Sequence, residues 1–115
     1  MNPTNEDVYP ILTDILSEIK SVFKDEYIHL GNDEVYYACW KSNPDIADWM
    51  DARNMTEYNQ LELYYSEKLL NIVKGLSKKA TVWQDVYDNH VPVNKEESLI
   101  KLIIFMVKLI EYSLS

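Results

Sequence analysis

The order of the helix and strand signals limits the fold more than any other feature of the sequence. Residues 27–30 and 80–83 are apolar, β-prone segments that predict two short strands. An amphipathic helix with Thr4 as its predicted N-cap precedes the first strand, and two helices, beginning at Pro44 and near Thr56, separate the strands. Helices that alternate with strands in this way are typical of parallel α/β proteins.

Two parallel strands do not make a stable sheet by themselves, because such sheets need several strands and helices on both faces. The chain has 115 residues, of which only two are glycines, so helix dominates the prediction. Residues 96–114 are a further apolar helix candidate after a loop at 90–94. The pattern therefore indicates a segment of a larger α/β fold followed by a different C-terminal helix.

Charge and composition exclude several classes of partner. The chain has 11 Lys and Arg against 19 Asp and Glu, a net charge of −8, which argues against nucleic acid and anionic membranes. The apolar run at 99–110 is broken by Lys101 and Lys108 and is too short to span a bilayer. We expect no transmembrane segment and no export leader in this chain. Cys39 is the one cysteine, so no internal disulfide forms, and we expect it to be a small buried side chain.

The strongest local signal is an acid pair, Asp33 and Glu34, directly after the first predicted strand. Catalytic groups gather at the carboxyl ends of parallel strands, and adjacent carboxylates raise one another's pKa. The alternative is that the pair lies in solvent at a helix start. A metal site formed with His29 is a weak alternative, because three ligands within six residues do not match common metal-binding spacings. We expect no metal and no cofactor.

Three blocks of sequence carry a resemblance to a known family. They are residues 29–35 (HLGNDEV), 39–44 (CWKSNP) and 82–88 (VWQDVYD). In this order and spacing they resemble the β-N-acetylhexosaminidases, family 20 of the glycoside hydrolases. The resemblance implies a fragment of a (β/α)₈ TIM barrel, from about strand 4 through strand 5 with flanking helices. It divides the chain into a partial catalytic barrel at 1–94 and a divergent apolar helical tail at 95–115.

The resemblance also implies an activity: hydrolysis of terminal non-reducing N-acetyl-D-hexosamine by a retaining mechanism in which the substrate's own acetamido group attacks. Glu34 would be the acid and base, and Asp33 would orient the acetamido group. Trp83 and His29 are assigned to the substrate-binding part of the site, Trp83 as a pocket wall and His29 as a support of the catalytic loop. The alternatives are barrel packing for Trp83 and a hydrogen-bonded core position for His29.

The partner implied by the resemblance is a glycan or glycoconjugate with terminal GlcNAc or GalNAc, and the location implied is lysosomal or secreted. Homo-oligomer formation stays open. Asn32 stands where the family typically has glycine, so it either adopts a positive φ or obstructs the site. The triplet Asn54-Met55-Thr56 is an acceptor sequon for N-glycans.

A complete barrel takes about 250 residues. The alternative function is therefore a truncated, non-catalytic product or interaction module that is inactive in isolation.

Overall fold

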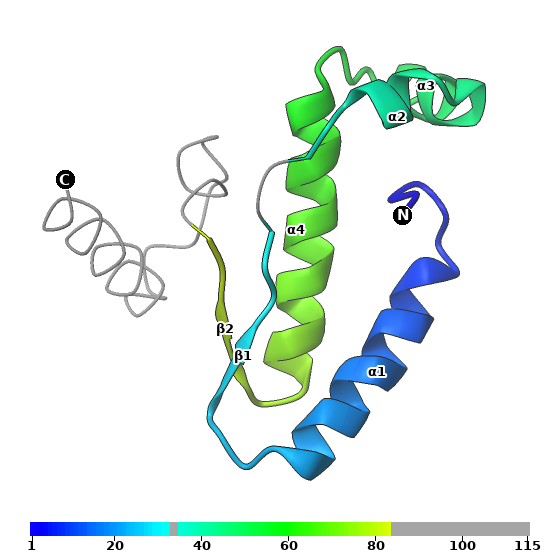
Figure 1. Ribbon diagram of the computed structural model, residues 1–115. Coiled ribbons are helices and arrows are strands. Elements are labelled where there is room, and N and C mark those ends of the chain that lie inside the picture. Colours follow the sequence, from blue (N-terminus) through cyan, green and yellow to red (C-terminus); the bar gives the residue numbers. More distant parts are fainter. Residues whose placement is uncertain (33–34, 84–115) are drawn as a thin grey trace, which may run out of the picture.

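The computed structural model describes residues 1–32 and 35–83 of the chain. The helix predicted over 96–114 lies outside the described residues. In chain order, the elements are α1 (Val8–Val22), β1 (Tyr27–His29), α2 (Ala38–Lys41), α3 (Pro44–Asp51), α4 (Tyr58–Gly75) and β2 (Lys79–Thr81) (Figure 1).

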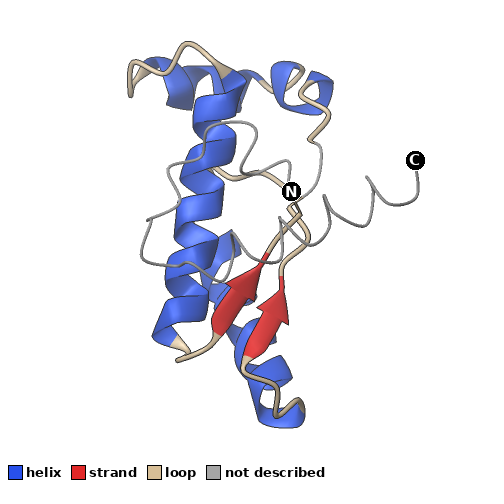
Figure 2. Ribbon diagram, turned by 90° about the vertical axis from the view of Figure 1, so that its left-hand side faces the viewer, coloured by secondary structure: helices blue, strands red, loops and turns tan. Residues whose placement is uncertain are grey.

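The two strands pair in parallel, as the alternation of helices and strands predicted. Ile28 lies opposite Ala80 in the register, and the described part of the chain forms a two-stranded sheet. Backbone hydrogen bonds continue the pairing at both ends, from Lys79 N to Glu26 O (2.9 Å) and from Leu30 N to Thr81 O (2.8 Å). Figure 2 shows both strands running in the same direction beside α4.

One apolar core joins the sheet to two helices. Leu16 of α1, Ile28 of β1 and two residues of α4, Leu69 and Val73, are buried together. Ala80 of β2 packs against this cluster, so α1 and α4 share one face of the sheet. The three- and four-residue spacing of the apolar side chains along both helices produces this packing.

A second core fixes α2 and α3 against the N-terminal half of α4. It contains Trp40, Ile46, Met50 and Leu61, and Leu61 is fully buried. Asn43 caps α3 as predicted: its side-chain oxygen accepts a hydrogen bond from Asp45 N at 3.0 Å. The turn of helix α2 was not predicted from the sequence.

The start of α1 corrects a prediction. Thr4 does not cap a helix but lies in an Asx turn, in which its backbone N–H and its hydroxyl both donate to the Asn2 side-chain oxygen, at 3.0 and 2.8 Å. A second turn follows, closed by a hydrogen bond from Val8 N to Asn5 O at 3.2 Å. Helix α1 therefore begins four residues later, at Val8, with Asp7 in the N-cap position.

Helix α4 begins and ends with recognisable caps. A capping box joins Glu57 and Gln60, so the helix starts at Tyr58, two residues after the predicted Thr56. At the other end Ser77 has a φ of 57°. Hydrogen bonds from Ser77 N to Lys74 O (3.0 Å) and from Lys78 N to Val73 O (3.2 Å) form a Schellman motif. This turn leads directly into β2.

Candidate active site

The carboxyl ends of β1 and β2 lie side by side, and the hydrogen bonding between them extends past the strands. Trp83 N donates to Gly31 O at 2.9 Å. This bond brings together the segment just before the predicted acid pair and the segment that carries the predicted pocket wall. The carboxyl end of a parallel sheet is where ligands bind in α/β folds, so the geometry supports a site here.

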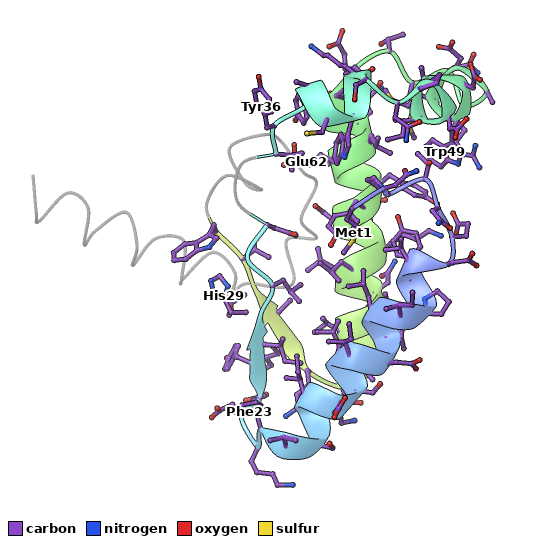
Figure 3. The ribbon with its side chains drawn as sticks, turned by 45° about the vertical axis from the view of Figure 1, so that its right-hand side comes forward. Met1, Phe23, His29, Tyr36, Trp49 and Glu62 are labelled. Carbon is purple, nitrogen blue, oxygen red and sulfur yellow. The ribbon has the colours of Figure 1, made fainter. Side chains whose placement is uncertain are left out.

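Two of the predicted site residues contact each other at this edge. The ring centroids of His29 and Trp83 are 4.9 Å apart, with an angle of 62° between the planes. Trp83 is 44% exposed, so a large apolar surface is open to solvent. Figure 3 shows His29 on the side of β1 away from α1 and α4. Both side chains therefore lie outside the core that α1 and α4 cover in the described part of the chain.

His29 also contacts the loop that follows its strand. Its Nδ1 accepts a hydrogen bond from Gly31 N at 3.0 Å, so the neutral ring carries its proton on Nε2. The bond fixes the first turn of the chain after β1. This is the contact that the predicted supporting role requires, and the role itself stays a prediction.

Asp33 and Glu34, the predicted acid pair, lie outside the described residues. The residues before them adopt left-handed conformations, with φ of 74° at Gly31 and 58° at Asn32. Asparagine tolerates this region better than most residues, which explains how it can stand at a position where glycine is usual. The Asn32 side-chain Nδ2 is buried and has no hydrogen-bond partner among the described residues.

The segment after the acid pair is anchored to α4. The Tyr37 hydroxyl donates to the carboxylate of Glu62, which is only 5% exposed. Burial, and then this bond to a carboxylate, raise the pKa of Tyr37 to about 12. The Tyr37 ring also stacks on Trp40 and on Tyr58, with centroid distances of 5.6 and 5.9 Å. These contacts fix the backbone three residues beyond Glu34.

Sequence reasoning missed both members of this pair. A signal for Glu62 was present, because it precedes Ser66, Leu69 and Val73 by four, seven and eleven residues, which places it on their buried helix face. A carboxylate on a buried face requires a hydrogen-bond donor. Nothing in the sequence identified Tyr37 as that donor.

The described part of the chain contains no group of metal ligands, no membrane-spanning helix and no buried cysteine. There, no three His, Cys, Asp or Glu side chains lie close enough to hold a metal ion. No helix among the same residues is long and apolar enough to cross a membrane. Cys39 is exposed on α2, so the prediction of a buried side chain was wrong. Its neighbour Trp40 occupies the buried position of that turn.

The comparison with protein families settles the ancestry. The model of the glycosyl hydrolase family 20 catalytic domain matches residues 1–103. The chain belongs to glycosyl hydrolase family 20. The predicted site residues of this family 20 segment, His29, Asp33, Glu34 and Trp83, all fall inside the matched range.

Individual relatives agree with this assignment. The segment is 45% identical over 96 residues to beta-hexosaminidase subunit alpha of Rattus norvegicus, covering 84% of this chain and 18% of the relative. It is 43% identical over 90 residues to beta-hexosaminidase subunit beta of Homo sapiens, covering 77% of this chain and 16% of the relative. The chain thus spans less than a fifth of the length of these relatives.

A solved structure shows the same arrangement. The family 20 segment superposes on the beta-N-acetylhexosaminidase from Bacteroides fragilis with a TM-score of 0.64 and 26% sequence identity. The match covers 74% of this chain and 17% of that one. Most of the described fold is therefore shared with this solved relative.

Proposed function

We propose that this chain supplies the acid pair and one pocket wall of a β-N-acetylhexosaminidase, which removes terminal non-reducing N-acetylhexosamine from glycans or glycoconjugates. The observation that carries the proposal is the hydrogen bond from Trp83 N to Gly31 O at the carboxyl ends of the two strands. It brings the exposed indole beside the loop that leads into Asp33 and Glu34. In this proposal β1 and β2 are the fourth and fifth strands of the barrel.

The proposed reaction uses a nucleophile from the substrate itself. The acetamido oxygen attacks the anomeric carbon while Glu34 protonates the departing glycosidic oxygen. The bond to the leaving group breaks, and an oxazolinium ring forms. Asp33 accepts a hydrogen bond from the acetamido N–H and stabilises the positive charge. Glu34 then takes a proton from water, which opens the ring, so that the configuration is retained.

In this proposal, Trp83 binds the substrate and His29 positions the catalytic loop. An indole 44% exposed offers a rigid apolar face against which the acetamido methyl can pack. His29 contacts the Trp83 ring and holds Gly31, so we assign it a positioning role for the catalytic loop. By the family relationship, we propose that the working enzyme is lysosomal or secreted.

A second candidate function concerns the isolated chain. Four apolar side chains of α1 and the residue after it remain 49 to 65% exposed, namely Ile11, Ile15, Val22 and Phe23. The described sheet has two strands and two unpaired edges. Catalysis needs its groups held to about 0.5 Å, which such a fragment does not provide. We therefore propose that the 115-residue chain alone is non-catalytic.

The test replaces the matching segment of rat beta-hexosaminidase subunit alpha with residues 2–94 of this chain. Hydrolysis of 4-nitrophenyl N-acetyl-β-glucosaminide is measured for the chimera, its parent and the isolated 115-residue chain. We expect activity in the chimera and none in the isolated chain. Glu34→Gln should lower kcat by about 10²- to 10⁴-fold. Asp33→Asn should lower kcat by about 10²- to 10³-fold.

Controls separate chemistry from folding. Glu67→Gln, at an exposed position of α4, should leave kcat unchanged. The corresponding glucoside, which lacks the acetamido group, should not be cleaved. An inactive but folded chimera that Asn32→Gly restores would show that Asn32 obstructs the site. Full activity in Glu34→Gln, or in the isolated chain, would refute the respective proposal.

A further inference from the structure

The sequence contains one complete acceptor triplet for N-linked glycans. Asn54, Met55 and Thr56 have the order Asn-x-Thr with a residue other than proline in the centre. A second Asn-x-Thr triplet, Asn2-Pro3-Thr4, has proline in the centre and is therefore excluded. The chain thus offers one position for a glycan, Asn54, and one negative control, the triplet at residues 2–4.

The acceptor triplet lies in the connection between α3 and α4, with its polar side chains outward. Asn54 and Thr56 are exposed, whereas Met55 is half-buried and packs against the core of Trp40, Ile46, Met50 and Leu61. Met55 N also donates to Met50 O at 3.0 Å. The middle residue therefore anchors the loop, and the two residues on either side of it face solvent.

The side chains of Asn54 and Thr56 differ from those of Asn2 and Thr4 in their hydrogen bonding. Neither the Asn54 amide group nor the Thr56 hydroxyl makes a hydrogen bond to another described residue, whereas the Asn2 side-chain oxygen accepts two bonds from Thr4. Asn54 has a φ of 56°, in the left-handed region typical of turns. A glycan on Asn54 therefore displaces no contact of the described fold.

We infer that Asn54 carries an N-linked glycan in the mature protein. The reaction joins Asn54 Nδ2 to the anomeric carbon of an oligosaccharide carried on a lipid pyrophosphate. The bond from that carbon to the pyrophosphate breaks, the lipid pyrophosphate leaves with the electron pair, and the amide nitrogen loses a proton. The inference rests on the lysosomal or secretory location in the proposed function, because proteins bound for either location enter the secretory pathway, where they meet this donor.

The glycan would lie at the strand-end side of the molecule. Figure 1 shows that the loop between α3 and α4 is at the end of α4 toward which β1 runs. The long connection from β1 to α4 contains both the acid pair and Asn54. Glycosylation would thus add a hydrophilic chain to the same connection that carries the proposed chemistry, and it would leave the bond from Tyr37 to the buried Glu62 in place.

The first test uses the full 115-residue chain with an added secretory leader, translated in the presence of microsomes. We expect one larger species, which the amidase PNGase F converts back to the unmodified size. Asn54→Asp and Thr56→Ala should abolish the larger species, and Asp tolerates the left-handed backbone as Asn does. Thr56→Ser should retain it, and Thr4→Ala should have no effect. Absence of the larger species in the unmutated chain would overturn the inference.

The second test uses the natural product, isolated with an antibody to residues 59–78 and treated with PNGase F. Deamidation of Asn54 after the treatment, read by peptide mass, would support the inference. An unmodified Asn54 in the natural product would overturn it, even with modification in microsomes. That result would contradict the lysosomal or secreted location and leave the family and the proposed acid pair unaffected. Loss of hydrolysis in Glu34→Gln tests the proposed function separately.

Discussion

The hydrogen bond between Tyr37 and Glu62 allows the sharpest prediction about stability. Glu62 is 5% exposed, and the Tyr37 hydroxyl is the hydrogen-bond donor to its carboxylate. A hydrogen bond to a charged group contributes about 1.5 to 3 kcal/mol, and a buried acceptor without its donor also loses solvation. Tyr37→Phe should therefore lower the free energy of unfolding by about 2 to 3 kcal/mol.

A double-mutant cycle separates the bond from the packing of the rings. Glu62→Leu removes the buried carboxylate, and the double variant with Tyr37→Phe removes both polar groups, a change that can be nearly neutral. We expect a coupling energy of about 1.5 to 3 kcal/mol between the two positions. The assay is urea denaturation of the 115-residue chain followed by tryptophan fluorescence, to which Trp40, stacked on Tyr37, contributes together with Trp49 and Trp83.

A neighbouring tyrosine provides the matched control. Tyr36 is 80% exposed, so Tyr36→Phe should change the free energy of unfolding by less than about 0.5 kcal/mol. A cost of Tyr37→Phe that equals that of Tyr36→Phe would refute the reasoning, because it would mean that the carboxylate of Glu62 remains hydrated. A coupling energy near zero would refute it as well.

The same pair predicts a loss of stability at high pH. The pKa of Tyr37 is raised from 10.0 to about 12 in the folded chain. The unfolded tyrosine therefore loses its proton first, so stability falls as the pH rises from 10 toward 12 and does not depend on this group below pH 10. The free energy of unfolding, measured by urea denaturation at several pH values in this range, should fall less steeply with pH for Tyr37→Phe than for the unmutated chain. The same pH dependence in both would contradict the assignment.

Three further predictions concern the cores and the turns. Leu61→Ala should lower the free energy of unfolding by about 2 to 5 kcal/mol, because Leu61 is fully buried. Ile11→Ala, at a position 58% exposed, should lower it by less than about 0.5 kcal/mol. Equal urea midpoints for the two variants would contradict this. Gly75→Ala should stabilise the chain by about 0.5 to 1 kcal/mol, since a Cβ there meets nothing within 4 Å. Ser77→Gly should raise the melting temperature by relieving about 1 kcal/mol of left-handed strain, and a lower value would refute this.

Much of the fold was accessible from the sequence because it depends on local patterns. The parallel strand pair and the cap at Asn43 follow from spacing and from residue types at helix starts. The start of α1 was predicted too early, because two turns, closed by the bonds from Asn5 N to Asn2 O and from Val8 N to Asn5 O, precede the helix. Asn and Thr side chains favour turns as well as helix caps, and the sequence does not rank the two.

The candidate site, too, has parts that local sequence patterns predicted and parts that only tertiary packing decided. The order of its sequence blocks was enough to indicate the family. The role of Asp33 and Glu34 stays a prediction, which rests on their place in the sequence after a strand. The contact of His29 with Trp83 joins residues far apart in the chain, and only the strand register creates it. The bond from Tyr37 to Glu62 likewise exists only because α4 packs beneath the connection after β1. Periodicity shows which face of a helix is buried, but which donor meets a buried carboxylate is decided by packing between distant segments.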